Sequence, residues 1–461
     1  MTLAEFVALF VEYLGNLLSV LLALAILSGR KEAKATLGWL LLVLIFPYLG
    51  AIAYFIFGRP PQPLLTRKST FSAKYLPSDV AGQTEPLART SRLTGMGPIL
   101  CRNLEFLPGA EAKYPRLLAD IEAAKRRVVL CYYVFRRDAT GRRFLNLLER
   151  KAREGVEVCF LYDGWGAIWL NFGHFLRPYK EGGVRARPYH PVADPLQMSR
   201  LNFRNHRKIA VIDGEIGYTG SVNIGDEYLG RHARFGPWKD VHVRFEGAAA
   251  AALEEVFRED WKTTTGETLE PSPPPAVAGD TWIHVIPSGP GQAQEKLFPL
   301  VFAQLAAARA RVDILTPYLV PDHSLVAALS VASRQGAEVR VLLPGQSNHP
   351  LVAAAGRSYY EELVDEGVEL YETVEGMLHA KALLIDDAWA MVGSTNLDDR
   401  SFHLNFEINV ATSHAPFCAA VGNTFANWLP AARRVTPQQL AGRSLPARLV
   451  ESACRTLSPV L

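Results

Sequence analysis

Reactive residues occur in two copies of one pattern, each a His-x-Lys-x-x-x-x-Asp motif followed by Gly-Ser-x-Asn. The residues are His206, Lys208, Asp213, Ser221 and Asn223 in the first copy, and His379, Lys381, Asp386, Ser394 and Asn396 in the second. Every equivalent pair is 173 positions apart, as in 379 − 206 and 396 − 223. Polar residues do not repeat in register by chance, so the pattern predicts a duplicated chemical site.

The residue types of this pattern indicate chemistry on phosphate. Residues i and i+2 of a strand share a face, and apolar residues follow Lys208 and Lys381, so each His should point with its Lys. An imidazole is a nucleophile or proton carrier near neutral pH, and a neighbouring ammonium suits an anionic substrate better than a zinc site. Gly-Ser-x-Asn adds backbone, hydroxyl and amide donors for phosphate oxygens. A core His, a surface Lys and a turn would explain one copy, but not two in register.

Alternating strands and helices must position these residues. The expected elements are strands at 127–134 and 156–162 around a helix at about 140–154, and strands at 312–320 and 338–343 around a helix at about 325–335. This alternation predicts α/β layers in each half, with helices covering a largely internal sheet. Neither copy alone supplies both an attacking base and a second proton carrier. The site is therefore expected where the halves meet.

The two motifs resemble those of the phospholipase D superfamily, and the surrounding sequence resembles bacterial cardiolipin synthases. The segments that carry the narrower resemblance are Ile224–Leu229, Pro237–Asp240, Thr316–Tyr318, Arg357–Tyr360 and Asp399–Phe402 with Asn405 and Glu407. Gly220-Ser221 departs from the Gly-Gly of many relatives. The resemblance implies two tandem phospholipase D-like α/β sandwich domains forming a pseudo-twofold unit.

The resemblance also implies roles for the motif residues. One His attacks phosphorus and forms a phosphohistidine, while the other protonates the departing alcohol and later deprotonates the incoming one; His206 is favoured as the nucleophile. The residues implied to hold the non-bridging oxygens are Lys208, Lys381, Asn223 and Asn396, with Ser221 and Ser394 as weaker candidates. No metal or other cofactor is implied. For Asp213 and Asp386, a turn or structural ion pair is as well supported as a catalytic role.

Each copy also carries a candidate for orienting a histidine. Glu407 follows the second motif, and Asp240 occupies the same place after the first. A carboxylate that accepts the Nδ1 proton would fix which nitrogen faces phosphorus. The alternative is a surface carboxylate on an edge strand.

Two apolar segments near the N-terminus predict a membrane hairpin over residues 1–60. Residues 6–27 and 37–57 can each cross about 30 Å of hydrocarbon at about 1.5 Å per residue. A cleaved signal peptide fits less well, because Lys and Arg are missing from the extreme N-terminus and a second span follows at once.

The rest of the chain is divided by composition and repeat. Residues 61–96 are rich in Pro, Ser and Thr and are predicted to be a linker. The two phospholipase D-like domains are expected at 97–270 and 276–461, with the Pro-rich stretch 271–275 as the seam. Five scattered cysteines fit a reducing compartment better than a disulfide framework, which favours a cytoplasmic catalytic body on a multi-pass protein of the bacterial inner membrane.

The combined expectation is a cardiolipin-forming phosphatidyltransferase that joins two phosphatidylglycerols at the membrane, with oligomeric state left open. Rivals from the same superfamily are a phospholipase D hydrolase, a phosphatidylserine synthase and a nuclease. A net charge of +3 without a long basic stripe, joined to membrane spans, argues against a nucleic-acid partner. A lipid-binding scaffold is the non-enzymatic rival, but it would not need two reactive histidines.

Two further groups of residues have two explanations each. An apolar set at helical spacing predicts either a core helix or a surface dipping into the bilayer: Trp165, Ile168, Trp169, Phe172, Phe175 and Leu176. Arg357, Tyr359 and Tyr360 could contact a lipid headgroup or pack as aromatic core.

Overall fold

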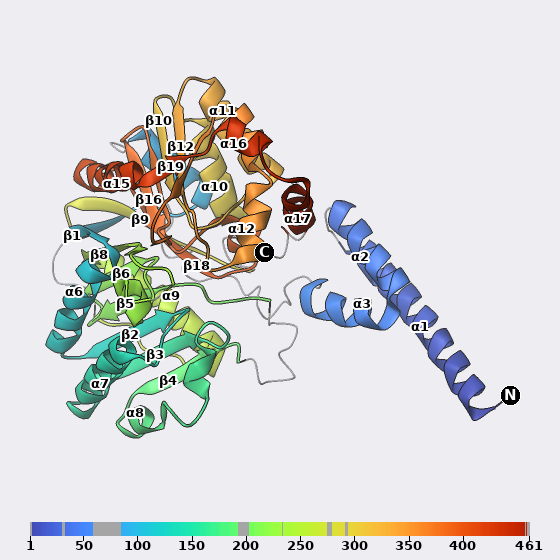
Figure 1. The fold of residues 1–461 in the computed structure, drawn as a ribbon. Helices are drawn as coiled ribbons and strands as arrows, with labels where there is room; N and C mark the ends of the chain where they lie inside the picture. The colour runs from blue at the N-terminus through green and yellow to red at the C-terminus, as the bar shows by residue number, and fades with distance from the viewer. Residues whose placement is uncertain are drawn as a thin grey trace. The chain divides into compact units, whose positions relative to one another are not determined.

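Figure 1 shows the fold of the computed structural model, which describes residues 2–29, 33–58, 84–191, 202–232, 234–273, 279–290, 294–456 and 458. The chain forms two compact units. The first contains the apolar helices that end at residue 58, and the second contains the α/β body described from residue 84 onward.

The long helix of the first unit is α1 (Leu3–Ser28). Thr2 caps it, because its hydroxyl accepts the Glu5 N–H while the Glu5 carboxylate accepts the Thr2 N–H. Among the described residues, α1 is the one helix both long and apolar enough to cross a membrane. It covers the first predicted span.

The second predicted span, residues 37–57, is not one helix. α2 (Ala33–Ile45) ends before Pro47, where α3 (Pro47–Ala53) begins and leads into the π-helical turn η1 (Tyr54–Gly58). Proline has no N–H to donate and disfavours helical backbone in the residue before it. Phe46 accordingly has φ −127° and ψ 74°. One long helix and two short ones therefore replace the expected pair of full spans.

Polar side chains and a glycine hold these three helices together. Ser19 Oγ donates to the Val43 carbonyl at 2.8 Å, and the Tyr48 hydroxyl donates to the Val11 carbonyl at 2.5 Å. Gly50 lets α3 fold back on α2, since a Cβ there would lie 2.8 Å from the Leu42 carbonyl oxygen. Each hydroxyl thus has a partner inside the apolar unit.

A fifteen-stranded sheet forms the centre of the second unit, in the order β19-β13-β12-β10-β15-β16-β18-β9-β1-β8-β6-β5-β2-β3-β4. Its first-half strands are β1 (Ile99–Pro108), β2 (Arg127–Tyr132), β3 (Glu157–Asp163), β4 (Arg185–Tyr189), β5 (Ile209–Ile212), β6 (Ile216–Gly220) and β8 (Val241–Glu246). Its second-half strands are β9 (Thr281–Ser288), β10 (Arg311–Leu315), β12 (Glu338–Pro344), β13 (Glu369–Thr373), β15 (Ala382–Ile385), β16 (Trp389–Gly393), β18 (Glu407–Thr412) and β19 (Ala432–Arg434). Two small pairs complete the strands, β7 (Trp238–Lys239) with β14 (Met377–Leu378) and β11 (Leu319–Val320) with β17 (Leu397–Asp398).

The halves are related by a pseudo-twofold axis between β1 and β9. These strands are antiparallel, and Ile99 pairs with Ile283. The separation 283 − 99 = 184 equals that of the helix-capping residues Asp138 and Asp322, 322 − 138 = 184. When a residue pairs with its own repeat equivalent on an antiparallel strand, a local twofold axis passes between the two residues. The duplication seen in the sequence is therefore also a structural one.

Helices cover both faces of the sheet (Figure 1). The main helices are α6 (Gly109–Ala123), α7 (Ala139–Arg153) and α9 (Ala248–Thr265) in the first half, and α10 (Gln294–Ala306), α11 (His323–Arg334) and α15 (Ala415–Trp428) in the second. On β2, Val128 and Leu130 face the core under α6 and α7, whereas Val129 and Cys131 face the core shared with α9. Both faces of β2 are therefore buried, as the continuous apolar run of this strand predicts.

Shorter helices connect these layers. They are α5 (Glu85–Thr94), η2 (Ile168–Asn171), α8 (Arg177–Glu181), η4 (Asp226–Leu229), α12 (Pro350–Arg357), α13 (Tyr360–Asp365), α14 (Asp399–His403), η5 (Leu429–Ala431), α16 (Pro437–Ala441) and α17 (Leu445–Arg455).

α5 lies inside the stretch expected to be a linker. Its Ser91 hydroxyl lies 2.9 Å from His284 Nε2, and Trp389 Nε1 donates to Thr90 Oγ1 at 3.1 Å. The last third of the predicted linker is thus a helix packed on the second half. Residues 61–83 lie outside the described residues, as do residues 274 and 275 of the expected seam. One core cluster includes residues of both halves, such as Val129 and Val341.

Candidate active site

Each motif histidine is hydrogen-bonded through its backbone to the opposite half of the body. The His206 N–H donates to the Phe406 carbonyl at 2.9 Å, and the His379 N–H donates to the Lys239 carbonyl at 2.8 Å. His206 precedes β5, and His379 lies between β14 and β15. The pairing of β7 with β14 continues the second link. The site therefore lies where the halves meet, as expected.

The carboxylates that contact the imidazoles are also exchanged between the halves. His206 Nδ1 lies 3.0 Å from both carboxylate oxygens of Glu407, and His379 Nδ1 lies 2.9 Å from Asp240 Oδ2. Both carboxylates are fully buried. The ionised Asp240 carboxylate only accepts hydrogen bonds, so its contact assigns the His379 proton to Nδ1 and leaves Nε2 as the basic nitrogen. In its ionised form Glu407 is placed to do the same for His206.

The motif serines contact these carboxylates rather than the space in front of the histidines. Ser221 Oγ donates to Asp240, and Ser394 Oγ donates to Glu407. The backbone N–H groups of both serines are engaged as well, at 2.9 Å to the Val241 carbonyl and 3.0 Å to the Ile408 carbonyl. The geometry thus makes them supports of the carboxylates and gives no basis for the expected contacts with phosphate oxygens.

The two motif lysines are buried beside the histidines. Lys208 Nζ donates to the His206 carbonyl at 2.5 Å, and Lys381 Nζ donates to the His379 carbonyl at 2.6 Å. Lys381 Nζ also lies 3.0 Å from His379 Nε2. Burial lowers the pKa of Lys208 to about 8 and that of Lys381 to about 7, although neighbouring carboxylates oppose the shift.

Burial and the lysine charges keep the imidazoles neutral. Burial and the charge of Lys381 lower the pKa of His379 to about 3, and burial with both lysines holds the pKa of His206 well below its usual range. Each lysine therefore acts on the histidine of the other copy as well as on its own.

The two carboxylates differ in their ionisation. Burial raises the pKa of Glu407 to about 7. Burial also acts to raise the pKa of Asp240, but the contacts of Asp240 with His379, Lys381 and Ser221 together outweigh it and lower the pKa to about 2. The pseudo-symmetric site is therefore not electrostatically symmetric.

The motif asparagines lie in the same buried region, with different surroundings. Asn223 Oδ1 accepts the Val134 N–H at 3.1 Å, which fixes the orientation of its amide. Asn396 Oδ1 is buried and has no hydrogen-bond partner among the described residues. Leaving a buried amide oxygen without a hydrogen bond costs free energy, so Asn396 Oδ1 is available to accept a hydrogen bond from a ligand or a water molecule.

Asp213 and Asp386 are not brought to the histidines. The Asp213 carboxylate accepts backbone N–H groups of residues 125–127, and the Asp386 carboxylate accepts those of residues 309–311. Asp213 lies five positions beyond Lys208 along extended β5, which corresponds to about 16 Å. Both residues have positive φ, 54° and 50°. They therefore support the turn and the start of the neighbouring strand, the structural alternative named for them.

Several side chains around the site had not been singled out as site residues. The Tyr133 ring lies 4.9 Å from the His206 ring, and the Trp238 ring lies 5.6 Å from the His379 ring. Trp238 Nε1 also donates to Asp240 at 3.2 Å. Trp238 belongs to a segment that carried the family resemblance, whereas Tyr133 gave no signal beyond lying in a predicted strand.

The backbone around Asn223 is fixed by polar side chains of α6. Lys113 Nζ donates to the Val222 carbonyl at 2.7 Å, and the Tyr114 hydroxyl donates to the Asn223 carbonyl at 2.8 Å. The positions 184 residues later are Leu297 and Phe298, so apolar residues replace both donors in the second half. This difference adds to the asymmetry of the two copies.

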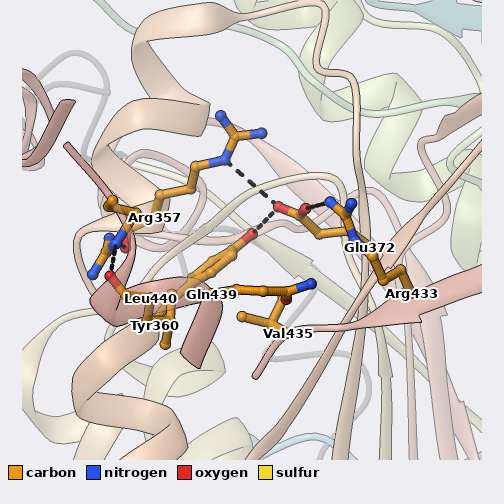
Figure 2. Close-up of a pocket in the computed structure, with 8 residues that line it drawn as sticks. Arg357, Tyr360, Glu372, Arg433, Val435, Gln439 and Leu440 are labelled. Atoms are coloured by element: carbon orange, nitrogen blue, oxygen red, sulfur yellow. Dashed lines mark hydrogen bonds and ion pairs between the residues drawn. The ribbon is translucent and has the colours of Figure 1, made fainter. Parts of the chain in front are cut away.

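The residues considered for headgroup contact belong to a different place. Tyr359 and Tyr360 are buried, and the Tyr360 hydroxyl donates to Glu372 at 3.2 Å. Figure 2 shows Arg357, Tyr360 and Arg433 converging on Glu372 beside a cavity of about 200 Å³. No residue of the two motifs lines that cavity. The aromatic-packing explanation therefore fits the tyrosines.

Across the described ranges, no group of three His, Cys, Asp or Glu side chains is placed to hold a metal ion. The groups gathered at the site are two imidazoles, two ammoniums, two carboxylates and amide side chains. Such a set can attack phosphorus, exchange protons and neutralise phosphate charge.

Comparison with known proteins agrees with this chemistry. A family model described as "Cardiolipin synthase, PLD-like domain" matches residues 117–261 and 301–429, and one described as "Phospholipase_D-nuclease N-terminal" matches residues 17–59. The cardiolipin synthase of Geobacillus kaustophilus is 36% identical over 463 residues, covering 96% of this chain and 92% of that protein. The cardiolipin synthase of Listeria innocua is 34% identical over 469 residues, covering 95% and 96%.

A solved structure shows the same fold. The phosphatidylserine synthase of Haemophilus influenzae aligns with a TM-score of 0.61 at 15% identity, over 82% of this chain and 100% of that one. The sequence relatives are similar over nearly the whole chain, and the domain model matches once in each half. The chain therefore belongs to the cardiolipin synthases of the phospholipase D-like family.

Proposed function

We propose that this cardiolipin synthase condenses two phosphatidylglycerol molecules into cardiolipin and glycerol through a phosphohistidine. The observation that carries the proposal is the exchange of carboxylates: Glu407 holds Nδ1 of His206, and Asp240 holds Nδ1 of His379. This contact leaves two basic Nε2 atoms in one buried site, one for attack on phosphorus and one for proton transfer.

In the first step, Nε2 of His206 attacks the phosphorus of one phosphatidylglycerol. The bond from phosphorus to the glycerol headgroup oxygen breaks, and His379 gives its Nε2 proton to that oxygen. The bound phosphodiester is an anion, so it favours protonation of a neighbouring imidazole whose pKa in the empty site is low. The products of this step are a phosphatidyl group on His206, glycerol and a neutral His379.

In the second step, neutral His379 accepts the proton of a headgroup hydroxyl on a second phosphatidylglycerol. The oxygen attacks phosphorus, the bond to His206 Nε2 breaks, and cardiolipin forms while His379 becomes protonated again. Lys208, Lys381, Asn223 and Asn396 are assigned to the non-bridging oxygens in both steps. Ser221 and Ser394 are assigned an indirect role: each donates a hydrogen bond to the carboxylate that orients a histidine.

His206 is the proposed nucleophile by family resemblance, and the asymmetry of the site supports a division of roles. Glu407 behind His206 has a pKa of about 7, whereas Asp240 behind His379 stays ionised. A fully ionised partner stabilises the imidazolium that a general acid must form, which suits His379. Mass analysis of protein quenched during turnover should find phosphorus on His206; phosphorus on His379 would reverse the assignment.

We further propose how the chain is arranged at the membrane. α1 is assigned as a membrane span, and α2 with α3 is assigned to the same bilayer, in a multi-pass or re-entrant arrangement. Five buried free cysteines support a catalytic body on the reducing, cytoplasmic side. The catalytic body is assigned to the two repeats at 97–270 and 276–461.

The test of transferase against hydrolase chemistry is the product ratio. Vesicles of phosphatidylglycerol as the single lipid should yield more cardiolipin than phosphatidic acid, because the second substrate is concentrated in the same surface. Added glycerol should compete for the phosphohistidine and lower the cardiolipin yield. Predominant phosphatidic acid with no effect of glycerol would favour a phospholipase D hydrolase instead.

A further inference from the structure

Large aromatic side chains are exposed on the segment between β3 and α8. Trp165, Trp169 and Phe172 are 57%, 62% and 53% exposed. The rings of Trp169 and Phe172 lie 5.7 Å apart, so they form one cluster. We call residues 164–176 the aromatic loop. Of its two possible explanations, a core helix is thus excluded for these three residues.

The aromatic loop is bonded to the segment that carries His206. The buried Asp163 carboxylate accepts the Trp165 and Gly166 N–H groups at 2.9 Å through one oxygen. Its other oxygen accepts the N–H of Asn205, the residue before His206, at 3.0 Å. A single carboxylate therefore fixes the start of the loop relative to the reacting histidine.

Close packing reinforces this link. A Cβ at Gly166 would lie 2.5 Å from the Tyr133 carbonyl oxygen and 2.8 Å from its ring, so the loop approaches Tyr133 as closely as its backbone allows. The Tyr133 ring in turn lies 4.9 Å from the His206 ring. The start of the aromatic loop is therefore packed against the surroundings of His206, while the exposed rings of Trp169 and Phe172 lie further along it.

Cationic side chains surround the aromatic loop. Arg137 and Arg142 lie 4.8 and 5.0 Å from the centre of the Phe175 ring, and Arg137 also donates to the Phe172 carbonyl. Residues of the loop such as His174 also line a cavity of about 250 Å³, together with Arg177 and Lys180. Arg177 pairs with Glu181 at 2.7 Å. The cations nonetheless outnumber the carboxylates here.

We propose that the aromatic loop inserts into the headgroup region of an anionic bilayer and holds the active site against its lipid substrate. Trp and Phe are the side chains that occupy the water–hydrocarbon boundary, and flanking Arg and Lys match the charge of phosphatidylglycerol. A protein partner would explain the exposed rings alone, but not the four neighbouring cations Arg137, Arg142, Arg177 and Lys180 or the bonds to the His206 segment. The inference rests on the activity toward phospholipid and is independent of which histidine attacks phosphorus.

The position of the loop in a membrane can be measured on the full-length protein. The five native cysteines are buried, so Trp169→Cys can be labelled with a fluorophore sensitive to polarity. Trp282→Cys is the matched control, because Trp282 is 43% exposed but lies six positions along β9 from Ser288, which pairs with Glu407; six positions correspond to about 20 Å. In phosphatidylglycerol vesicles, lipids with a quencher near the headgroup should quench the label at 169 and spare the label at 282. A label at 169 that stays in water would overturn the proposal.

Activity provides an independent readout. Trp169→Ser with Phe172→Ser should lower kcat/KM on phosphatidylglycerol vesicles about tenfold or more, because two apolar side chains no longer leave water on docking. Activity on dispersed short-chain phosphatidylglycerol should stay unchanged, as should both activities of Trp282→Ser. Equal loss on vesicles and on dispersed lipid would show that the loop only supports His206 and would overturn membrane docking. Loss of cardiolipin formation by the unaltered protein would instead contradict the proposed reaction.

Discussion

His206 of the first repeat shares its Nδ1 proton with Glu407 of the second repeat, at 3.0 Å from both carboxylate oxygens. The reciprocal contact joins His379 to Asp240 at 2.9 Å. Each imidazole is therefore held by a residue about 140 to 200 positions away in sequence. The reacting geometry depends on the interface between the halves.

We expect Glu407→Gln and Asp240→Asn to lower kcat by about 10² to 10⁴-fold with little change in KM. The amide keeps the shape of the side chain but loses the charge that stabilises an imidazolium. Initial rates on phosphatidylglycerol measure the effect. Glu372→Gln is the control, because Glu372 is also a largely buried carboxylate but lines the separate cavity of Figure 2. Nearly full kcat in the Glu407 variant would remove the orienting role.

The two histidines should behave as one catalytic unit. His206→Ala and His379→Ala should each lose at least about 10³-fold in rate, and the double variant should be little worse than either. Losses that multiply in the double variant would indicate two independent sites. Thermal unfolding of all three variants separates lost chemistry from lost folding.

The lysines predict an alkaline limit to activity. An ammonium loses its charge as the pH rises through its pKa, so Lys381 with a pKa of about 7 and Lys208 with a pKa of about 8 should lose their hold on phosphate above these values. The pH profile of kcat/KM, which reports the free enzyme, should therefore fall between about pH 7 and 9. In Lys381→Arg the charge persists, and the fall should move to higher pH. An unchanged profile, like that expected of exposed Lys125→Arg, would contradict this prediction.

Cardiolipin formation should survive exhaustive treatment with EDTA. The proposed roles place ammonium and amide groups where many phosphoryl enzymes use magnesium. Activity is measured before and after chelation and after adding back single divalent ions. Loss of activity on chelation, with recovery when one divalent ion is added back, would contradict the metal-free mechanism.

Asp213→Ala should cost stability rather than catalysis. Three backbone N–H groups, two exposed and one half-buried, lose their acceptor, which corresponds to about 1–3 kcal/mol of unfolding free energy. Asp386→Ala should behave alike, whereas the neighbouring exposed Asp387→Ala is a control with a smaller effect. Denaturant unfolding measures the loss, and kcat per folded molecule should stay unchanged. A large fall in kcat at normal stability would restore a catalytic role.

The sequence alone was informative where function restricts residue types. The spacing of 173 positions and the strand–helix–strand order predicted a duplicated site on α/β layers, because reactive residues and buried strands leave local patterns. The exchange of Asp240 and Glu407 between halves left none, since nothing local specifies a partner across an interface. The carboxylate partners of the two serines were not predictable for a related reason, since the same hydroxyl can donate to phosphate or to a carboxylate.

The apolar helices of the first unit show a different limit of prediction from sequence. Pro47 stands in the middle of the second predicted span and ends α2, but an apolar run without charges outweighed that signal. The helix α5 was missed because its buried residues contact the second half, so its stability comes from packing rather than from its own periodicity. In the aromatic loop the pattern misled in the opposite direction. The apolar residues there have helical spacing, which is typical of a buried helix face, but three of their rings are exposed.

The antiparallel contact of Ile99 with Ile283 makes the body equivalent to a symmetric dimer whose subunits have been joined in one chain. In a true dimer, one coding change alters both subunits, and dilution separates them. Here each half can change alone, and neither can leave the other. A mutation of the orienting carboxylate in one repeat therefore affects the histidine of the other repeat. The repeats have already diverged: the polar residues Lys113 and Tyr114 of the first correspond to the apolar Leu297 and Phe298 of the second. Because both repeats are in one chain, every molecule contains one copy of each of the two unequal halves.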